Sequence, residues 1–145
     1  MAIVKKVKSK ELFMGRLDYG ADLLEEIAGI CRKNNIQLGR VEAIGAVQKA
    51  SLAYYNQQTF EYQFFTLDKH LEIIKLVGNI SLKDGHPFVH AHIALADDSG
   101  AVYGGHLVSG TIIFACEIII ESIAGPFFER KHDEETRLPL WAMTE

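Results

Sequence analysis

The spacing of apolar residues changes along the chain, and the first clear pattern is that of a helix. Apolar side chains recur at helical spacing at six positions: Leu23, Leu24, Ile27, Ala28, Ile30 and Cys31. Asp22 precedes them as a candidate N-cap, and Glu25 follows three residues later, as in a capping box. This pattern predicts a helix over residues 22–34, which the pair Asn34-Asn35 ends.

Alternating or continuous apolar runs predict strands over most of the remaining chain. Residues 3–7 and 11–17 are expected to form two short strands before the helix. Turn residues separate the strands expected after it, which cover residues 39–47, 50–56, 60–67, 71–82, 88–96, 101–108, 111–122 and 126–130. One helix packed on a strongly bent, mostly antiparallel sheet is the simplest arrangement that buries so many strands. The predicted fold class is therefore α/β, more narrowly α+β, in a single compact domain over residues 1–145.

Residues 112–120 are apolar at nearly every position, which predicts a strand covered on both faces. A neighbouring subunit would provide the second cover. Glu117 interrupts this run, and an unpaired carboxylate there would be costly. We therefore expect a salt bridge or a subunit contact for Glu117, with a catalytic base as the alternative.

The net charge and the cysteines limit the classes of protein to which the chain can belong. With 15 Lys and Arg against 19 Asp and Glu, the net charge is −4, so there is no general basic field to hold nucleic acid. The lysines of residues 5–10 precede no apolar signal segment, and residues 111–123 are too short and too charged to span a membrane. Cys31 and Cys116 are expected to be buried free thiols. These features predict a cytoplasmic protein without a membrane partner.

Three of the six histidines are spaced for metal binding. His90 and His92 are two residues apart in a predicted strand, so their side chains share a face, with Cα atoms about 6.5 Å apart. If residues 98–100 form a three-residue hairpin loop with Gly100 at positive φ, His106 lies opposite His92 on the next strand. A four-residue loop would turn His106 away from the other two.

Three neutral imidazoles at about 2.0–2.1 Å suit Zn²⁺ and leave a fourth position open, although Ni²⁺, Cu²⁺, Co²⁺ and Fe²⁺ also accept imidazole. The glycines Gly104 and Gly105 would leave space around such an ion. From spacing alone, the alternative is that these histidines are solvent-facing strand residues. His70, His86 and His132 are not assigned as ligands, because they lie in charged or turn-like surroundings.

Residues 86–97 (HPFVHAHIALAD) followed by residues 100–107 (GAVYGGHL) resemble the signature of the plants and prokaryotes conserved (PPC) family. Residues 39–42 and 71–80 resemble two further strands of the same family, and the resemblance covers about residues 13–128. It implies a compact α/β fold that assembles as a homotrimer. It also implies a zinc site formed by three histidines: His90, His92 and His106.

Two classes of function follow from the resemblance and the histidines. In plants the domain accompanies AT-hook motifs in nuclear DNA-associated proteins, which implies an assembly module; this chain has no AT-hook and is acidic, so DNA is expected to bind weakly. An open zinc site would instead serve a hydrolase or lyase acting on a small molecule. Glu42 is the candidate general base, and its alternative is a salt bridge with Arg40, Lys49 or a partner subunit. The sequence names no substrate.

Overall fold

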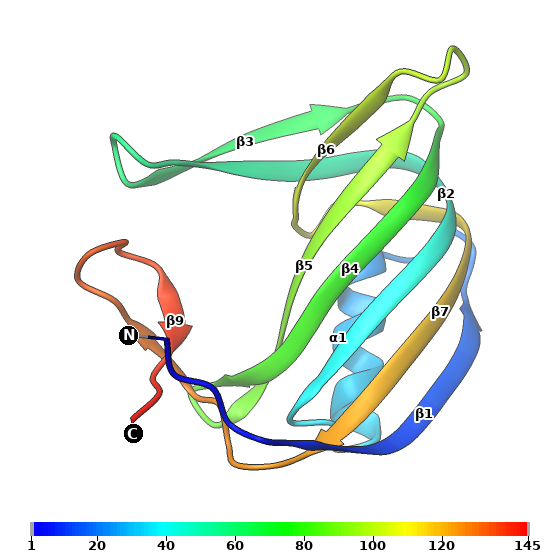
Figure 1. Cartoon of the computed structure of the whole chain (residues 1–145). Helices are drawn as coiled ribbons and strands as arrows, with labels where there is room; N and C mark the ends of the chain where they lie inside the picture. Colours follow the sequence, from blue (N-terminus) through cyan, green and yellow to red (C-terminus); the bar gives the residue numbers. More distant parts are fainter. Residues whose placement is uncertain (1, 145) are drawn as a thin grey trace.

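The computed structural model describes residues 2–144 and is dominated by a seven-stranded antiparallel sheet (Figure 1). In chain order the elements are β1 (Lys8–Leu17), α1 (Leu23–Lys33), β2 (Gly39–Asn56), β3 (Glu61–Leu67), β4 (Leu71–Lys83), β5 (His86–Ala96), β6 (Val102–Leu107), β7 (Ile112–Ala124), β8 (Arg130–His132) and β9 (Pro139–Trp141). The strand order is β1-β7-β2-β4-β5-β6, β3 pairs with β2, and β8 and β9 form a separate pair. A mostly antiparallel sheet with a helix on it is what the sequence predicts.

The long strand β2 belongs to two parts of the sheet. Its first half pairs with β7 and β4, whereas its second half pairs with β3 and, at Leu52 and Ala53, with β6. The path from β2 through β4, β5 and β6 therefore closes back on β2, and the sheet is strongly bent. Register shifts surround Gly45, whose φ is 148° and where a Cβ would overlap the carbonyl oxygen of Ala115. These bulges bend β2 without ending it, so the prediction of two strands over residues 39–47 and 50–56 is wrong.

The two ends of the chain also differ from the prediction. Residues 3–7 form no strand, because β7, the partner of β1, ends at Ala124 opposite Lys8 and offers nothing further to pair with. The strand expected over residues 126–130 is reduced to a single parallel bridge between Leu82 and Glu129, followed by β8. The strand β9, which pairs with β8, was not predicted.

The helix α1 begins at the predicted cap. The Asp22 carboxylate accepts a hydrogen bond of 3.1 Å from the amide of Glu25, while the Glu25 carboxylate accepts one of 2.9 Å from the hydroxyl of Ser109. The helix start is thereby tied to the loop between β6 and β7. Asn34 caps the other end, and Asn35 adopts a positive φ, as expected for residues that end a helix. No helix formed by residues 2–144 has the length and apolar character that crossing a membrane requires.

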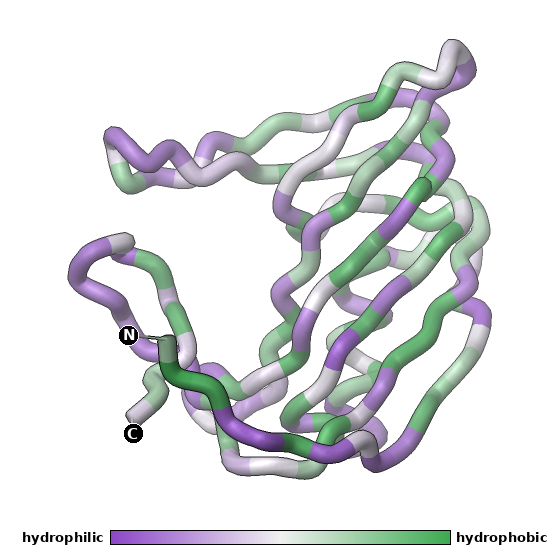
Figure 2. Tube along the Cα trace, viewed as in Figure 1, coloured by the Kyte–Doolittle hydropathy of each residue, from purple (hydrophilic) through white to green (hydrophobic). Residues whose placement is uncertain are grey.

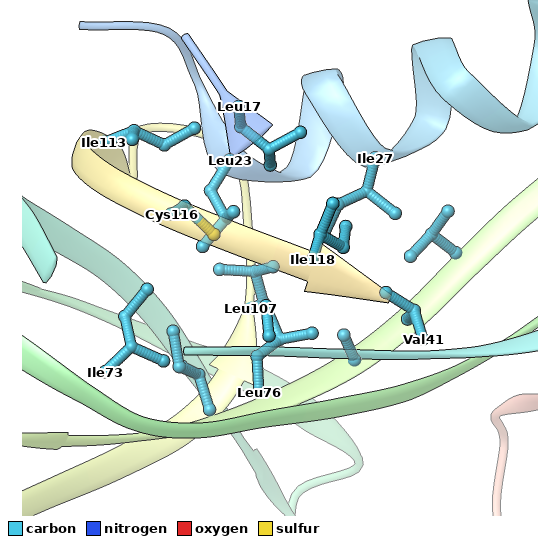
Figure 3. Close-up of a cluster of buried hydrophobic side chains, with 14 of the residues drawn as sticks. Leu17, Leu23, Ile27, Val41, Ile73, Leu76, Leu107, Ile113, Cys116 and Ile118 are labelled. Atoms are coloured by element: carbon cyan, nitrogen blue, oxygen red, sulfur yellow. The ribbon is translucent and has the colours of Figure 1, made fainter. Parts of the chain in front are cut away.

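One face of the sheet is covered by α1. Its residues Leu23, Ile27 and Cys31 are fully buried and join inward residues of the sheet, among them Val41 and Ile118, in the core (Figure 3). Cys31 and Cys116 are buried free thiols, as predicted, and burial raises the pKa of both to about 11. Hydrophobic and hydrophilic positions alternate along several strands in Figure 2. The face opposite α1 is not part of this core, so a functional site on the sheet must be sought there.

The strand β7 is buried on one face only. Ile113, Ile118 and Ile120 are at most 4% exposed, whereas Phe114 is 58% exposed and Glu117 is exposed as well. The expectation that this strand is covered on both faces is therefore not met within one chain. Glu117 forms no ion pair with any residue between 2 and 144.

Candidate metal centre

The strands β5 and β6 place the three histidines side by side. The amide of Asp97 donates a 3.0 Å hydrogen bond to the carbonyl of Ala101, and Gly100 has a φ of 80°. Residues 98–100 therefore form the predicted three-residue loop, and His92 pairs with His106 across the two strands. The predicted loop length and the predicted pairing of His92 with His106 are both confirmed.

All three imidazoles project from the face opposite α1. Val89, Ala91 and Ile93, which alternate with the histidines on β5, are buried in the core, so His90 and His92 point away from it. His106 is held from both sides, since its strand also pairs with β2 at Ala53. The site thus stands where three strands of the sheet meet.

The histidines form a cluster that can hold a metal ion. Each offers one ring nitrogen, and these nitrogens lie within 4.8 Å of one another. The ring centroids are 5.1 Å apart for His90 with His92 and with His106, and 5.6 Å apart for His92 with His106. A tetrahedral ion with zinc–nitrogen distances of about 2.1 Å would hold the nitrogens about 3.4 Å from one another, so any two of them would have to approach by at most about 1.4 Å.

Burial lowers the pKa of two histidines of the cluster and so favours their neutral, metal-binding form. The pKa of His90 is lowered to about 4, first by burial and then by the positive charges of His106, Arg130 and His92. Burial likewise lowers the pKa of His106. Near neutral pH these two imidazoles are uncharged, and a neutral imidazole is the form that binds a metal. The donor set therefore fits a divalent transition metal.

The cluster opens into a cavity of about 530 Å³. One wall is the β2–β3 hairpin, with Tyr55 and Tyr62, and the other is the β8–β9 segment, with Arg130 and Leu138. The two lie on the same side of the molecule in Figure 1, and the Tyr55 hydroxyl donates a 2.6 Å hydrogen bond to the carbonyl of Thr136 between them. The cavity is thus lined by segments far apart in the sequence.

Several residues of this cavity were not found from the sequence. Arg130, Lys83, Phe88 and Tyr62 all line it, and the ring of Tyr62 lies 5.3 Å from that of His106. Only Phe88 had a local signal, since it precedes His90 by two residues on β5 and so shares a strand face with His90 and His92. Tyr62 and Arg130 meet the site only through the bend of β2 and the return of the chain after β7, whereas Lys83 ends the neighbouring strand β4.

Glu42, the predicted general base, lies outside this cavity. Its carboxylate forms a salt bridge of 3.2 Å with Lys75, which is not one of the partners considered from the sequence. Val77 pairs with Glu42 on one side and with His92 on the other, so Glu42 is two strands from the cluster, about 10 Å at the usual strand spacing. A catalytic role for Glu42 stays a prediction.

The remaining histidines are apart from the cluster. The Nδ1 atom of His86 lies 2.8 Å from the carbonyl of Asp84, and His132 lies 3.8 Å from the carboxylate of Glu134. His70 is exposed before β4. Among residues 2–144 the metal-ligating side chains therefore gather at one place, which is the place that the spacing indicated.

The structure is thus a small domain in which a bent antiparallel sheet carries, at the wall of a cavity, three histidines that could hold a metal ion. The chain belongs to the Plants and Prokaryotes Conserved domain family (PCC, also written PPC), whose family model matches residues 4–124. The resemblance stated from the sequence is thereby confirmed.

Two solved structures and a curated relative are similar to this chain. A metal-containing protein from Archaeoglobus fulgidus is 42% identical, with a TM-score of 0.93 over 98% of this chain and 100% of that one. A PPC protein from Pyrococcus horikoshii is 33% identical, with a TM-score of 0.92 over 99% of each chain. The bifunctional protein GlmU of Synechococcus sp. (strain JA-3-3Ab) is 34% identical over 123 residues, which are 83% of this chain but 18% of that protein. This chain thus spans about a fifth of the length of the curated relatives that it matches.

Proposed function

We propose that this protein binds a divalent transition metal, zinc in the first place, through His90, His92 and His106, and that it acts on a small molecule as a metal-dependent hydrolase or lyase. The observation that carries the proposal is the position of the cluster at the wall of a cavity of about 530 Å³. A cavity of this size accommodates a small organic molecule.

The donor set favours a catalytic rather than a structural role. Structural zinc sites are closed by four protein ligands, whereas catalytic sites keep a position open. Among residues 2–144 the cluster contains three histidines and no fourth cysteine, histidine or carboxylate. A zinc ion held in this way supplies a Lewis acid that activates water or polarises a carbonyl.

The chain itself contributes orientation and proton donation. The pKa of Tyr62 is raised, mainly by burial, so its phenol stays protonated near neutral pH and can donate a hydrogen bond to a substrate oxygen. The apolar residues Phe88 and Leu138 line the same cavity, so a bound molecule that packs against them would displace water. Exclusion of water strengthens the electrostatic interactions within the site.

A relative supports the presence of a metal. The similar protein of Archaeoglobus fulgidus is described as metal-containing, and it is 42% identical over nearly the whole chain. Imidazole ligands are accepted by zinc, nickel, copper, cobalt and iron, so the donor set alone favours no single one among them. Zinc is proposed because three histidines with one open position are its common catalytic arrangement.

We also propose that the protein assembles as a homotrimer, as the family resemblance implies. Large apolar side chains are exposed on the sheet face opposite α1: Met14 at 78%, Ile44 at 57%, Val77 at 53% and Phe114 at 58%. Exposed apolar residues gathered on one face mark an interaction surface. Contact with identical subunits would also bury the face of β7 that is exposed within one chain.

Elemental analysis of the protein purified without a metal-binding tag tests the metal site. We expect close to one divalent metal ion per chain. The His92→Ala variant should lose it, because two imidazoles make a weak site, while the His132→Ala control should keep it. Wild-type protein that carries no metal and takes none up on titration would refute the proposal.

A further inference from the structure

Arg130 is a buried charge without an acidic partner among residues 2–144. It is 8% exposed, and its three hydrogen bonds all go to neutral acceptors: Nε to the Ser81 hydroxyl at 2.9 Å, Nη1 to the carbonyl of Pro139 at 3.0 Å and Nη2 to the side-chain oxygen of Asn79 at 2.7 Å. Burying an unpaired charge is costly, and neutral hydrogen bonds offset this cost only in part. The unpaired charge of Arg130 therefore favours binding of an anion from outside the chain.

The charged side chains that line the cavity are all positive. They are Arg130 and Lys83, and the lining includes no aspartate or glutamate. The Arg130 guanidinium and the Lys83 ammonium both lie over the ring of Phe88, 5.2 Å and 5.3 Å from its centroid. A divalent cation on the histidines would add to this positive charge, so the loaded cavity would select anions strongly.

Arg130 and the cluster are close enough to share one ligand. The residue that Arg130 binds, Asn79, pairs directly with His90 across β4 and β5. Directly opposed residues on antiparallel strands are about 4.5–5.5 Å apart. A molecule of a few atoms that enters the cavity can therefore reach the guanidinium at one end and the histidines at the other.

We propose that the cavity binds a small organic acid, whose carboxylate pairs with Arg130 while a second oxygen of the same molecule faces the metal held by His90, His92 and His106. This inference rests on the proposed metal site and names the class of substrate for it. The acid carries a small apolar group, because Phe88, Leu138 and Leu140 form part of the wall.

The remaining donors of Arg130 favour a carboxylate over a phosphate. A guanidinium has five N–H donors, and three are used within the chain, so that one remains on each terminal nitrogen. Two parallel N–H donors match the two oxygens of a carboxylate. Phosphate sites commonly add backbone amides from a helix start or a glycine loop, whereas strands and hairpins line this cavity.

The test uses the full chain loaded with Co²⁺, whose visible absorption reports on the metal's ligands. The probes are lactate, its neutral analogue propane-1,2-diol, and inorganic phosphate, with affinities measured by calorimetry in parallel. We expect lactate to change the spectrum and to bind at least 10-fold more tightly than either of the others. The Arg130→Gln variant should keep its Co²⁺ but bind lactate about 10- to 100-fold more weakly. The Arg137→Gln variant is the matched control, since Arg137 lies in the same β8–β9 segment but outside the cavity lining, and it should bind like wild type.

The outcomes separate this inference from the proposed function. Protein that takes up no metal would overturn both. Three results with protein that binds Co²⁺ would refute the organic acid as ligand but not the metal site. They are a preference for phosphate, equal affinity for lactate and the diol, and unchanged lactate binding after Arg130→Gln. The selectivity among the three probes is measured on the wild type, so the test holds even if Arg130→Gln fails to fold.

Discussion

Substitution of Gly78 by alanine would test how tightly the fold and the metal cluster are linked. Gly78 on β4 pairs with Ala91 on β5, which lies between His90 and His92. A Cβ at Gly78 would overlap the carbonyl oxygen of His90 and would lie 2.8 Å from the Cβ of Ala91. Carbon atoms in contact are normally about 3.5–4.0 Å apart, so β4 and β5 would have to move apart locally.

The expected cost follows from the nature of this clash. Overpacking in a well-packed region costs about 1–3 kcal/mol, and the upper half of that range applies because a backbone carbonyl cannot rotate away as a side chain can. At a urea m-value of about 2 kcal/mol/M, a loss of about 2–3 kcal/mol lowers the unfolding midpoint by about 1–1.5 M. The same movement displaces two of the three ligands, so metal affinity should fall by about 10-fold, as it does when groups that orient ligands are altered.

Urea unfolding of the metal-free protein measures the first effect without a contribution from metal binding. Competition with a coloured chelator measures the second. Gly15→Ala is the matched control, since it makes the same change on β1, where an added Cβ meets nothing within 4 Å. Equal midpoints and equal metal affinities for the two variants would show that β4 and β5 are not packed as described.

Three further predictions concern assembly, DNA and the turn beside the site. Light scattering should give about three times the chain mass of 16.2 kDa, and Ile119→Asp should disrupt assembly; a mass near that of one chain would contradict the trimer. Fluorescence anisotropy at about 0.15 M salt should show random duplex DNA bound no more tightly than about 10 μM, and submicromolar binding lost on changing Lys5, Lys6 and Lys8 to serine would contradict this. Hydrogen bonds from a serine hydroxyl and a lysine ammonium hold the pKa of Asp97 below its usual 3.8, so its stabilising contribution is present above that pH and lost as the pH falls further. Asp97→Ala should therefore lower the melting temperature at pH 7, and the difference from wild type should shrink in strong acid.

The parts of the fold that depend on neighbouring residues could be predicted from the sequence. The helix α1 and its cap follow from apolar spacing and from a side chain that reaches three residues ahead. Most strands after the helix follow from alternation between turn residues. The unbroken course of β2 could not be predicted, because bulges at Gly45 disturb the alternation in the same way as the end of a strand would.

The outer segments were mispredicted for a different reason. Residues 3–7 are rich in the β-branched residues typical of strands, but a strand also needs a partner, and β7 ends before it could pair with them. The strands β8 and β9 are three residues each, too short for a periodic pattern. Arg130 lies in this segment, so no local signal connected it with the histidines 24 to 40 residues earlier in the chain.

The ligands and the cavity therefore depend on two different kinds of information. The His90 and His92 pair is fixed by strand geometry alone, and His106 is added by one hairpin loop, so three residues in one 17-residue stretch suffice to build the cluster. The cavity depends on contacts such as the hydrogen bond between Tyr55 and Thr136, which joins residues 81 positions apart. A change that breaks this contact and leaves the β5–β6 hairpin intact should spare metal binding and weaken the binding of a small acid. A change in the length of the loop over residues 98–100 should instead weaken both metal binding and the binding of the acid, because a register shift of one residue would turn His106 to the other face of its strand and the acid is proposed to bind against the metal.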